Sequence, residues 1–304
     1  MNGLRQGSFR LFRLAGINVY LHWSWFLIAL IEINARQRAY SFPVWNVFEY
    51  LALFAIVTTH EFGHALACRQ VGGEANQIIL WPLGGVAYVD PPPRPGATLW
   101  SIAAGPLVNV ALLPILTALT WFSRSQGWDQ TMRDVDVFLQ AVWWTNVVLL
   151  AFNMLPIYPL DGGQILRSLL WFGLGRARSL LVAVIVGFVG MAGMVALAVW
   201  AHSVWFGILA VFILLNCWTG LRQAQALLRI AKLPRRERFS CPICKASPPM
   251  GDYWICGHCR KPFDMFQEQA TCPNCGTRLG ATRCLDCGRV SPIESWAVPV
   301  LAHK

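Results

Sequence analysis

Residues 179–221 contain no Lys, Arg, Asp or Glu, and this uncharged stretch limits the possible folds more than any other feature of the sequence. A helix needs roughly 20 apolar residues to cross a ~30 Å hydrocarbon core, so the stretch is long enough to cross twice. The whole chain is 56% hydrophobic and only 13% charged, whereas an average soluble domain has about 25% charged residues. The composition therefore excludes an ordinary soluble fold and indicates a polytopic α-helical membrane protein.

Apolar segments of helical length predict about six transmembrane helices. They cover residues 17–34, 44–70, 97–122, 137–155, 178–200 and 203–230. A further apolar stretch, residues 80–87 (LWPLGGVA), is too short and too rich in Gly and Pro to span. Irregular backbone at membrane depth needs hydrogen bonds from protein or from a water-filled cavity. We therefore expect a re-entrant β-hairpin at this point.

Six crossings place both termini on one side of the membrane, and the basic residues indicate which side. Cytoplasmic loops carry an excess of Lys and Arg. With the N-terminus inside, the outside loops hold only Arg36, Arg38, Arg124 and Arg133. We therefore predict a multi-pass protein with both termini in the cytoplasm, and this bias accounts for the net charge of +10. The N-terminal region also lacks the pattern of a cleaved signal peptide.

The composition changes abruptly at Pro234, where a short charged linker begins. We predict a membrane domain over residues 1–233 and a small cytoplasmic domain, the tail, over residues 234–304. The tail is polar and rich in Cys, Pro and Gly.

The second apolar segment ends with the sequence HEFGH at residues 60–64. On a helix, His60 and His64 lie one turn apart on the same face, where two imidazoles can bind one zinc ion. A catalytic zinc uses three protein ligands and a water, and Glu61 lies next to the first ligand as the general base for that water. The alternative without a metal is that these buried polar residues form hydrogen bonds to neighbouring helices. Because such residues are costly in a membrane and usually functional, we favour the metal site.

The third ligand must come from elsewhere in the chain, and Asp161 is the best candidate. It follows the fourth segment on the predicted cytoplasmic side, level with the end of the second segment. An Asp before two glycines can instead be a helix N-cap.

The HEFGH motif, together with residues 153–163 (NMLPIYPLDGG), closely resembles the site-2 protease family of intramembrane zinc metalloproteases. Residues 104–109 (AGPLVN) and 82–85 (PLGG) are also similar to that family, and the resemblance covers residues 14–230. It implies a catalytic zinc bound by His60, His64 and Asp161, with Glu61 as the base. The implied activity is hydrolysis of peptide bonds within transmembrane segments of membrane-anchored regulatory proteins.

The resemblance also implies that Asn153 binds the peptide or stabilises the oxyanion, a role that suits an amide donor. A cross-helix hydrogen bond is the alternative for this residue.

Gly84 and Gly85 at a hairpin edge could pair with an extended substrate by strand addition. Simple packing of the hairpin on a helix would explain the two glycines equally well. The role of His22 stays open, although a structural histidine is favoured.

The tail contains four Cys-x-x-Cys pairs. They are Cys241/Cys244, Cys256/Cys259, Cys272/Cys275 and Cys284/Cys287. Two such pairs can bind one tetrahedral zinc, so the tail predicts a double zinc-ribbon with two structural ions. Disulfides are the competing interpretation, but the cytoplasm is reducing. Sequential pairing gives two small ribbons, and a shared site for the middle two pairs stays possible.

The partners implied are a transmembrane protein substrate, the lipid bilayer and a protein that docks on the tail. Nucleic acid is a weaker interpretation of the basic residues, because they also balance the charge of Cys₄ zinc sites. A metal transporter and an inactive membrane scaffold are the rival functions. A transporter needs ligands that step across the bilayer, and the last two segments offer only His202. The substrate, its cleavage position and the oligomeric state are not encoded in any motif.

Overall fold

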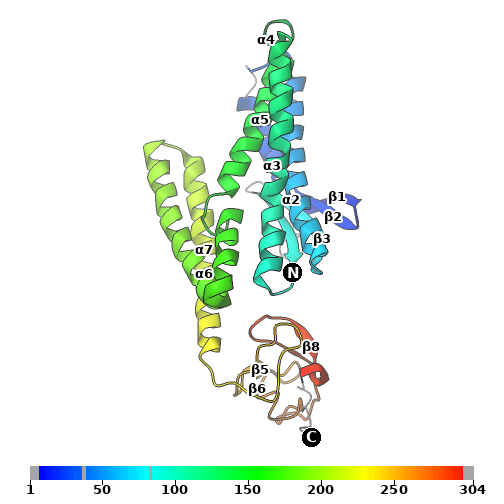
Figure 1. The fold of residues 1–304 in the computed structure, drawn as a ribbon, viewed down its shortest axis with the longest axis vertical. Helices are drawn as coiled ribbons and strands as arrows, with labels where there is room; N and C mark the ends of the chain where they lie inside the picture. Colours follow the sequence, from blue (N-terminus) through cyan, green and yellow to red (C-terminus); the bar gives the residue numbers. More distant parts are fainter. Residues whose placement is uncertain (1–6, 36–38, 82–83, 297–304) are drawn as a thin grey trace. The chain divides into compact units, whose positions relative to one another are not determined.

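The computed structural model describes residues 7–35, 39–81 and 84–296 of the chain. It divides into two compact units (Figure 1). Unit 1 comprises Met1–Gly173 and Val182–Thr219, and unit 2 comprises Leu174–Leu181 and Gly220–Lys304. The predicted domain boundary after residue 233 remains a prediction.

Five helices of the described residues are long and apolar enough to cross a membrane. They are α2 (Val44–Gln70), α3 (Pro95–Ser125), α5 (Arg133–Asn153), α6 (Asp161–Trp200) and α7 (Val204–Ala231). Two shorter helices, α1 (Trp25–Ala35) and α4 (Trp128–Thr131), complete the set in unit 1. The helix α6 is interrupted at Gly175, whose φ of 75° and ψ of 170° lie outside the helical region. These helices confirm the polytopic α-helical class.

The first predicted span, residues 17–34, does not form one long helix. Its first part is the strand β2 (Ile17–His22), and the 11 residues of α1 follow. At 1.5 Å per residue α1 is roughly 16 Å long, about half of the ~30 Å hydrocarbon core. The count of helices that can span is therefore five and not six among the described residues. The run was read as one helix because the alternating apolar residues of β2 lead directly into the apolar helix α1.

A four-stranded sheet lies beside α2. Its order is β1-β2-β3-β4. Besides β2, its strands are β1 (Ser8–Leu14), β3 (Glu74–Trp81) and β4 (Gly84–Asp90). The β2–β3 pair is parallel and the other two pairs are antiparallel. The expected hairpin at residues 80–87 is thus present as part of β3–β4, although its turn, residues 82–83, lies outside the described residues.

The core of unit 1 lies between this sheet and α2. Ile17, Val19 and Leu21 alternate along β2 and are buried with Ile78 and Leu80 of β3. On the helix side, Val57, Ala65 and Cys68 complete the same cluster. This burial fixes which face of α2 is turned toward the sheet.

An arginine at the end of α2 ties the helix to the first hairpin. Arg69 donates hydrogen bonds to the carbonyls of Ala15 (2.5 Å) and Gly16 (3.3 Å). Both turn residues have positive φ, as a tight hairpin turn requires. The position of α2 along its axis is therefore fixed by the turn between β1 and β2.

The opposite side of α2 packs closely against α3, and α5 packs against both (Figure 1). A Cβ at Gly63 would lie 2.6 Å from the carbonyl oxygen of Ala104, so only glycine allows the two backbones to approach this closely. Small residues at such contacts are typical of helix pairs in membranes. The close approach brings polar groups of α3 within reach of α2.

The tail repeats one local fold four times. In each Cys-x-x-Cys pair, the residue after the second Cys donates its N–H to the carbonyl of the first Cys, at 2.8–3.0 Å. That residue has φ between 59° and 76° in all four copies: Lys245, Arg260, Gly276 and Gly288. Short hairpins, β5 (Trp254–Ile255) with β6 (Pro262–Phe263) and β7 (Ala281–Arg283) with β8 (Val290–Pro292), support these turns. A 3₁₀-helix, Ile293–Trp296, ends the described chain.

Candidate metal centre

Side chains from α2 and α6 converge on one point inside unit 1. Nε2 of His60 lies 3.0 Å from Oδ2 of Asp161, and Nε2 of His64 lies 3.3 Å from the same oxygen. The two Nε2 atoms are 3.1 Å apart. All three side chains are largely buried, with exposed fractions of 4%, 13% and 7% for His60, Asp161 and His64.

This triangle has the size that a tetrahedral zinc site needs. Ligand atoms at 2.0–2.1 Å from a tetrahedral zinc are about 3.3 Å from one another. The three distances of 3.0, 3.1 and 3.3 Å are close to that value. Two imidazole nitrogens and one carboxylate oxygen are also a donor set that zinc accepts. The residues therefore fit a zinc ion, with one tetrahedral position left over.

Glu61 belongs to the same cluster. Ligand atoms of His60, Glu61 and His64 all lie within 4.8 Å of one another, and all three residues are buried. Its carboxylate is thus beside the metal position while the triangle is already complete without it. A carboxylate at this place can act as an acid or base for a group bound at the metal position.

The other nitrogen of each imidazole is held by α3. Nδ1 of His60 lies 2.6 Å from Oδ1 of Asn109, and Nδ1 of His64 lies 2.9 Å from the carbonyl oxygen of Ser101. Such partners fix the ring orientation and leave Nε2 free for a metal. Motif spacing alone did not predict these partners. Asn109 was part of the stretch that resembles the family, yet no role was assigned to it.

Gly105 allows α3 to lie this close to the metal ligands. A Cβ at this position would overlap Nε2 of His64 and would lie 2.8 Å from Nε2 of His60. A side chain at position 105 would therefore occupy the point where the ligand atoms meet.

Asp161 is positioned by the start of α6. The N-cap residue is Leu160, and Asp161 is the first helical residue. Its carboxylate is directed to the two histidines, so the N-cap alternative does not hold for this residue. Gly162 and Gly163 lie against the backbone of residues 154–158, where a Cβ would overlap main-chain atoms.

Two other polar residues of the sequence prediction make no hydrogen bond to this triangle among the described residues. Asn153 is the last residue of α5 and is partly buried, and no hydrogen bond joins its amide to the ligands among the described residues. The ring of His22 stacks on Trp81 with centroids 4.3 Å apart, and its Nδ1 contacts Oγ of Ser24. The structure brings together His60, Glu61, His64 and Asp161.

The eight tail cysteines form two clusters. One contains Cys241, Cys244, Cys284 and Cys287, and the other contains Cys256, Cys259, Cys272 and Cys275. Within them, the Sγ–Sγ distances across pairs are 3.6–3.8 Å. Sulfur atoms at 2.3 Å from a tetrahedral zinc are about 3.8 Å apart, so each cluster fits one Cys₄ site.

The pairing is nested and not sequential. The outer two pairs share one cluster and the middle two share the other, which is the second of the two arrangements that the sequence left open. Closing a longer loop costs little, since each doubling of length adds only about 0.6 kcal/mol. The contacts that bring two Cys pairs together therefore outweigh their separation along the chain.

The fold and the site define a class: a helical membrane protein with a buried His₂Asp cluster that fits a metal ion, beside a glutamate. The model of peptidase family M50 matches residues 48–133 and 126–197. The chain belongs to this family, which is the site-2 protease family that its motifs resemble.

Curated relatives and a solved structure agree with this assignment. The chain is 32% identical over 182 residues to the zinc metalloprotease MJ0392 of Methanocaldococcus jannaschii, a match that covers 59% of this chain and 50% of the relative. It is 28% identical over 224 residues to the putative zinc metalloprotease Rip3 of Mycobacterium tuberculosis, covering 66% of this chain and 55% of the relative. The chain thus spans only about half the length of these relatives.

Among solved structures, the fold is similar to the site-2 protease from Methanocaldococcus jannaschii. The TM-score is 0.52 at 25% sequence identity, and the match covers 70% of this chain and 95% of that structure. Almost all of the solved protease thus has a counterpart in this chain.

We predict that Gly105→Ala weakens metal binding between α2 and α6. Overpacking costs roughly 1–3 kcal/mol, which corresponds to about a 5–150-fold loss of zinc affinity. Gly193→Ala in α6 is the matched control, because a Cβ added at Gly193 meets no atom within 4 Å. Zinc content after dialysis against graded chelator measures the effect. Equal retention by the two variants would contradict the close approach of α3.

We also predict which cysteine losses act together. In a His60→Ala background, Cys241→Ala with Cys287→Ala should remove half of the tail zinc, since both belong to one cluster. Cys241→Ala with Cys259→Ala should remove nearly all of it. Elemental analysis of zinc per chain distinguishes the two pairs of changes, and the reverse result would support sequential pairing.

Proposed function

We propose that the chain is a zinc-dependent intramembrane endopeptidase that cleaves transmembrane segments of membrane-anchored regulatory proteins. The observation that carries the proposal is the triangle of His60, His64 and Asp161 ligand atoms with Glu61 beside it, buried among apolar helices. Buried ionisable residues in a membrane helix are expensive and are usually functional.

In the proposed site, His60, His64 and Asp161 hold one catalytic zinc. Zinc bound there would polarise the scissile carbonyl and make water a stronger nucleophile near neutral pH. Glu61 accepts the proton of the attacking water and then donates it to the leaving amine. Asn153 donates its amide N–H to the substrate peptide or to the oxygen that becomes negative during attack. Its place at the end of α5, eight residues before Asp161, supports this role.

We propose that the substrate binds as an extended strand. A peptide bond in a transmembrane helix is shielded by helical hydrogen bonds, so the substrate must unwind before hydrolysis. The strand β4 is at the edge of the sheet and contacts α2, the helix with the HEFGH motif. An edge strand offers unpaired backbone groups to an extended peptide. In a strand, every second side chain faces the same way. Cross-links from a Tyr88→Cys variant to every second residue of the substrate would support this pairing, and cross-links without this two-residue repeat would oppose it.

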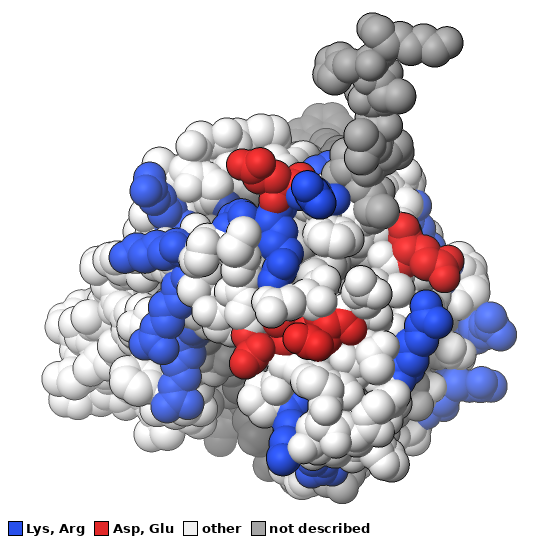
Figure 2. All heavy atoms as spheres, turned by 90° about the horizontal axis from the view of Figure 1, so that it is seen from below, with Lys and Arg blue, Asp and Glu red and all other residues white. Residues whose placement is uncertain are grey.

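The tail is proposed to hold two structural zinc ions and to bind a protein partner or control substrate access. Its core includes Cys241, Cys256, Cys272 and Cys284 themselves, so metal binding and folding are linked. On the face shown in Figure 2, Lys and Arg form several groups with Asp and Glu between some of them. This mixture favours protein recognition over nucleic acid. Partners captured by the wild-type tail should be lost when the Cys pairs are replaced.

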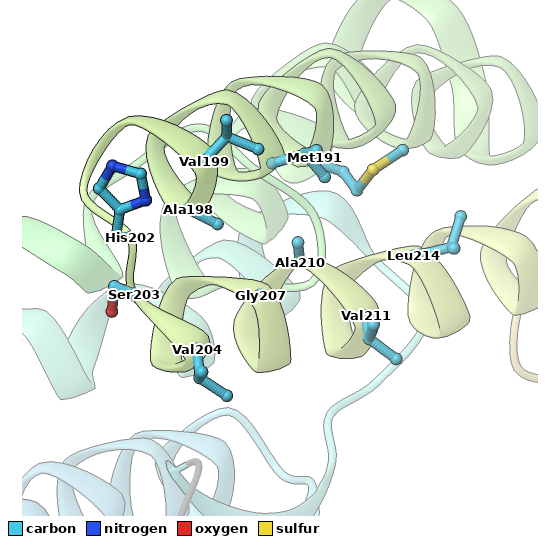
Figure 3. Close-up of a pocket in the computed structure, with 11 residues that line it drawn as sticks. Met191, Ala198, Val199, His202, Ser203, Val204, Gly207, Ala210, Val211 and Leu214 are labelled. Atoms are coloured by element: carbon cyan, nitrogen blue, oxygen red, sulfur yellow. The ribbon is translucent and has the colours of Figure 1, made fainter.

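The rival function of metal transport gains no support from the described residues. A groove of about 370 Å³ lies between α6 and α7, and its lining is apolar except near the connecting turn (Figure 3). His202 and Ser203 in that turn are its polar members. One histidine at one end of a groove does not make a path of ligands across a membrane. An inactive scaffold is disfavoured because a purely structural metal site has no use for Glu61.

We predict that Glu61→Gln abolishes proteolysis while zinc binding persists. Loss of a general base costs typically 10²–10⁴-fold in rate, and Glu61 is not needed to complete the ligand triangle. Membrane proteomes of cells with the variant should accumulate uncleaved membrane fragments that wild-type cells lack. Glu74→Gln, an exposed glutamate on β3, is the control and should match the wild type. If the two variants give the same fragments, the protease proposal fails.

Both termini are proposed to be cytoplasmic, with a membrane domain over residues 1–233. Five spanning helices alone would put the termini on opposite sides, so the proposal requires the segment containing α1 to cross as well. Tags at both ends should be digested together in vesicles whose cytoplasmic face is outward. Digestion of one tag alone would show that this segment does not cross.

A further inference from the structure

A chain of amide hydrogen bonds leads from the metal centre into the bundle. Nδ2 of Asn109 on α3 donates to Oδ1 of Asn146 on α5 at 2.8 Å. Nδ2 of Asn146 in turn donates to the backbone carbonyl of Asn109 at 3.0 Å. Both asparagines are fully buried, and His60, which Asn109 contacts, is only 3% exposed. Three helices are thus joined at one polar point.

We infer that Asn146 and Asn109 are positioning residues that hold the His60 imidazole with its proton on Nδ1 and its Nε2 free for the metal. The inference rests on the proposed function, because it assumes that the Nε2 atom is a zinc ligand. It adds to the proposed site a residue, Asn146, that lies on a different helix from every ligand.

The direction of the hydrogen bonds supports this role. An amide side chain can present either its oxygen or its nitrogen to a neighbour, and the hydrogen-bond network decides between them. If Asn109 presented its nitrogen to His60, Nδ1 would have to accept and the proton would move to Nε2. That tautomer could not bind a metal through Nε2.

Asn146 makes the productive orientation of Asn109 the favoured one. Its Oδ1 can only accept, so the group of Asn109 that faces it must be the N–H₂, which leaves Oδ1 for His60. The Nδ2 of Asn146 is committed to the Asn109 carbonyl, so a flip of Asn146 would place its N–H₂ against the N–H₂ of Asn109 and would lose two hydrogen bonds. In a buried site, leaving a polar group without a hydrogen-bond partner is costly. The two amides therefore lock each other and, through Asn109, the histidine.

The apolar environment makes this lock effective. Outer hydrogen-bond partners of metal-bound histidines typically change metal affinity about 10–100-fold when they are removed. His64 is oriented by the Ser101 carbonyl, which cannot flip. His60 depends on an amide side chain, and this is why it needs a second residue to fix that amide.

The test measures release of labelled zinc from the full-length protein in detergent to excess chelator. A His60→Ala sample, which keeps only tail zinc, gives the background. Asn109→Leu should release the bundle zinc roughly 10–100-fold faster, and Asn146→Leu should accelerate release by about tenfold. Asn216→Leu is the matched control. Its amide bonds only within α7, to the Phe212 carbonyl, so release should match the wild type.

Two further variants separate positioning from general stability. Asn109→Asp keeps an acceptor for Nδ1 of His60 and should release zinc more slowly than Asn109→Leu. The double variant Asn109→Leu with Asn146→Leu should release zinc no faster than Asn109→Leu alone, because Asn146 acts through Asn109. Additive effects, or an Asn146→Leu rate equal to that of Asn216→Leu, would overturn the inference. If His60→Ala retains as much zinc as the wild type, the proposed catalytic site itself fails.

Discussion

The structure depends on one costly arrangement: two imidazoles and a carboxylate with their lone pairs directed at a single point among apolar helices. When both imidazoles carry their protons on Nδ1 and no cation lies between them, the lone pairs of His60, His64 and Asp161 repel one another at 3.0–3.3 Å. Burial makes this repulsion worse, because a low dielectric strengthens every charge interaction. A bound cation would remove this repulsion. The contacts around the site keep the three ligand atoms together.

Those contacts act on α2 from both sides. On one side the sheet packs against the helix and Arg69 bonds the turn between β1 and β2. On the other side Gly63 and Gly105 let α3 approach until its carbonyl and amide groups reach the imidazoles. Since each histidine is held through Nδ1, the metal-binding nitrogens are oriented before any metal arrives. Precise ligand geometry thus comes from small residues as much as from polar ones.

The parts of the site that could be predicted from sequence are those that a local repeat or motif encodes. The spacing of His60 and His64 follows from the helical period. Asp161 was chosen from its place after the fourth apolar segment, and the resemblance implies the same ligand. The four Cys-x-x-Cys pairs are likewise local. Asn146 could not be found in this way, because its role arises from a contact between α5 and α3 that no spacing in the chain reveals. The only available signal was a polar residue within an apolar segment.

Two other differences have the same origin. The nested pairing of the cysteine clusters depends on which turns face each other in the folded tail, and sequence distance is a poor guide to that. The first apolar segment was read as one long helix because hydropathy does not separate the strand β2, which is buried against α2, from the helix α1 that follows it. Its Ile17, Val19 and Leu21 face the core and not lipid. Both features depend on tertiary contacts, whereas the residue types alone were enough to assign the local chemistry.

The two kinds of metal site in this chain are prepared in opposite ways. Membrane helices satisfy their own backbone hydrogen bonds, so the helices that carry His60, His64 and Asp161 do not need a metal in order to form. The tail has strands of only two or three residues, and its cysteines form part of its core. We therefore expect metal binding at the cysteines to be coupled to the folding of the tail. Zinc would be a catalytic cofactor in the bundle and a structural ion in the tail. The same element would then serve catalysis at one site and folding at the others.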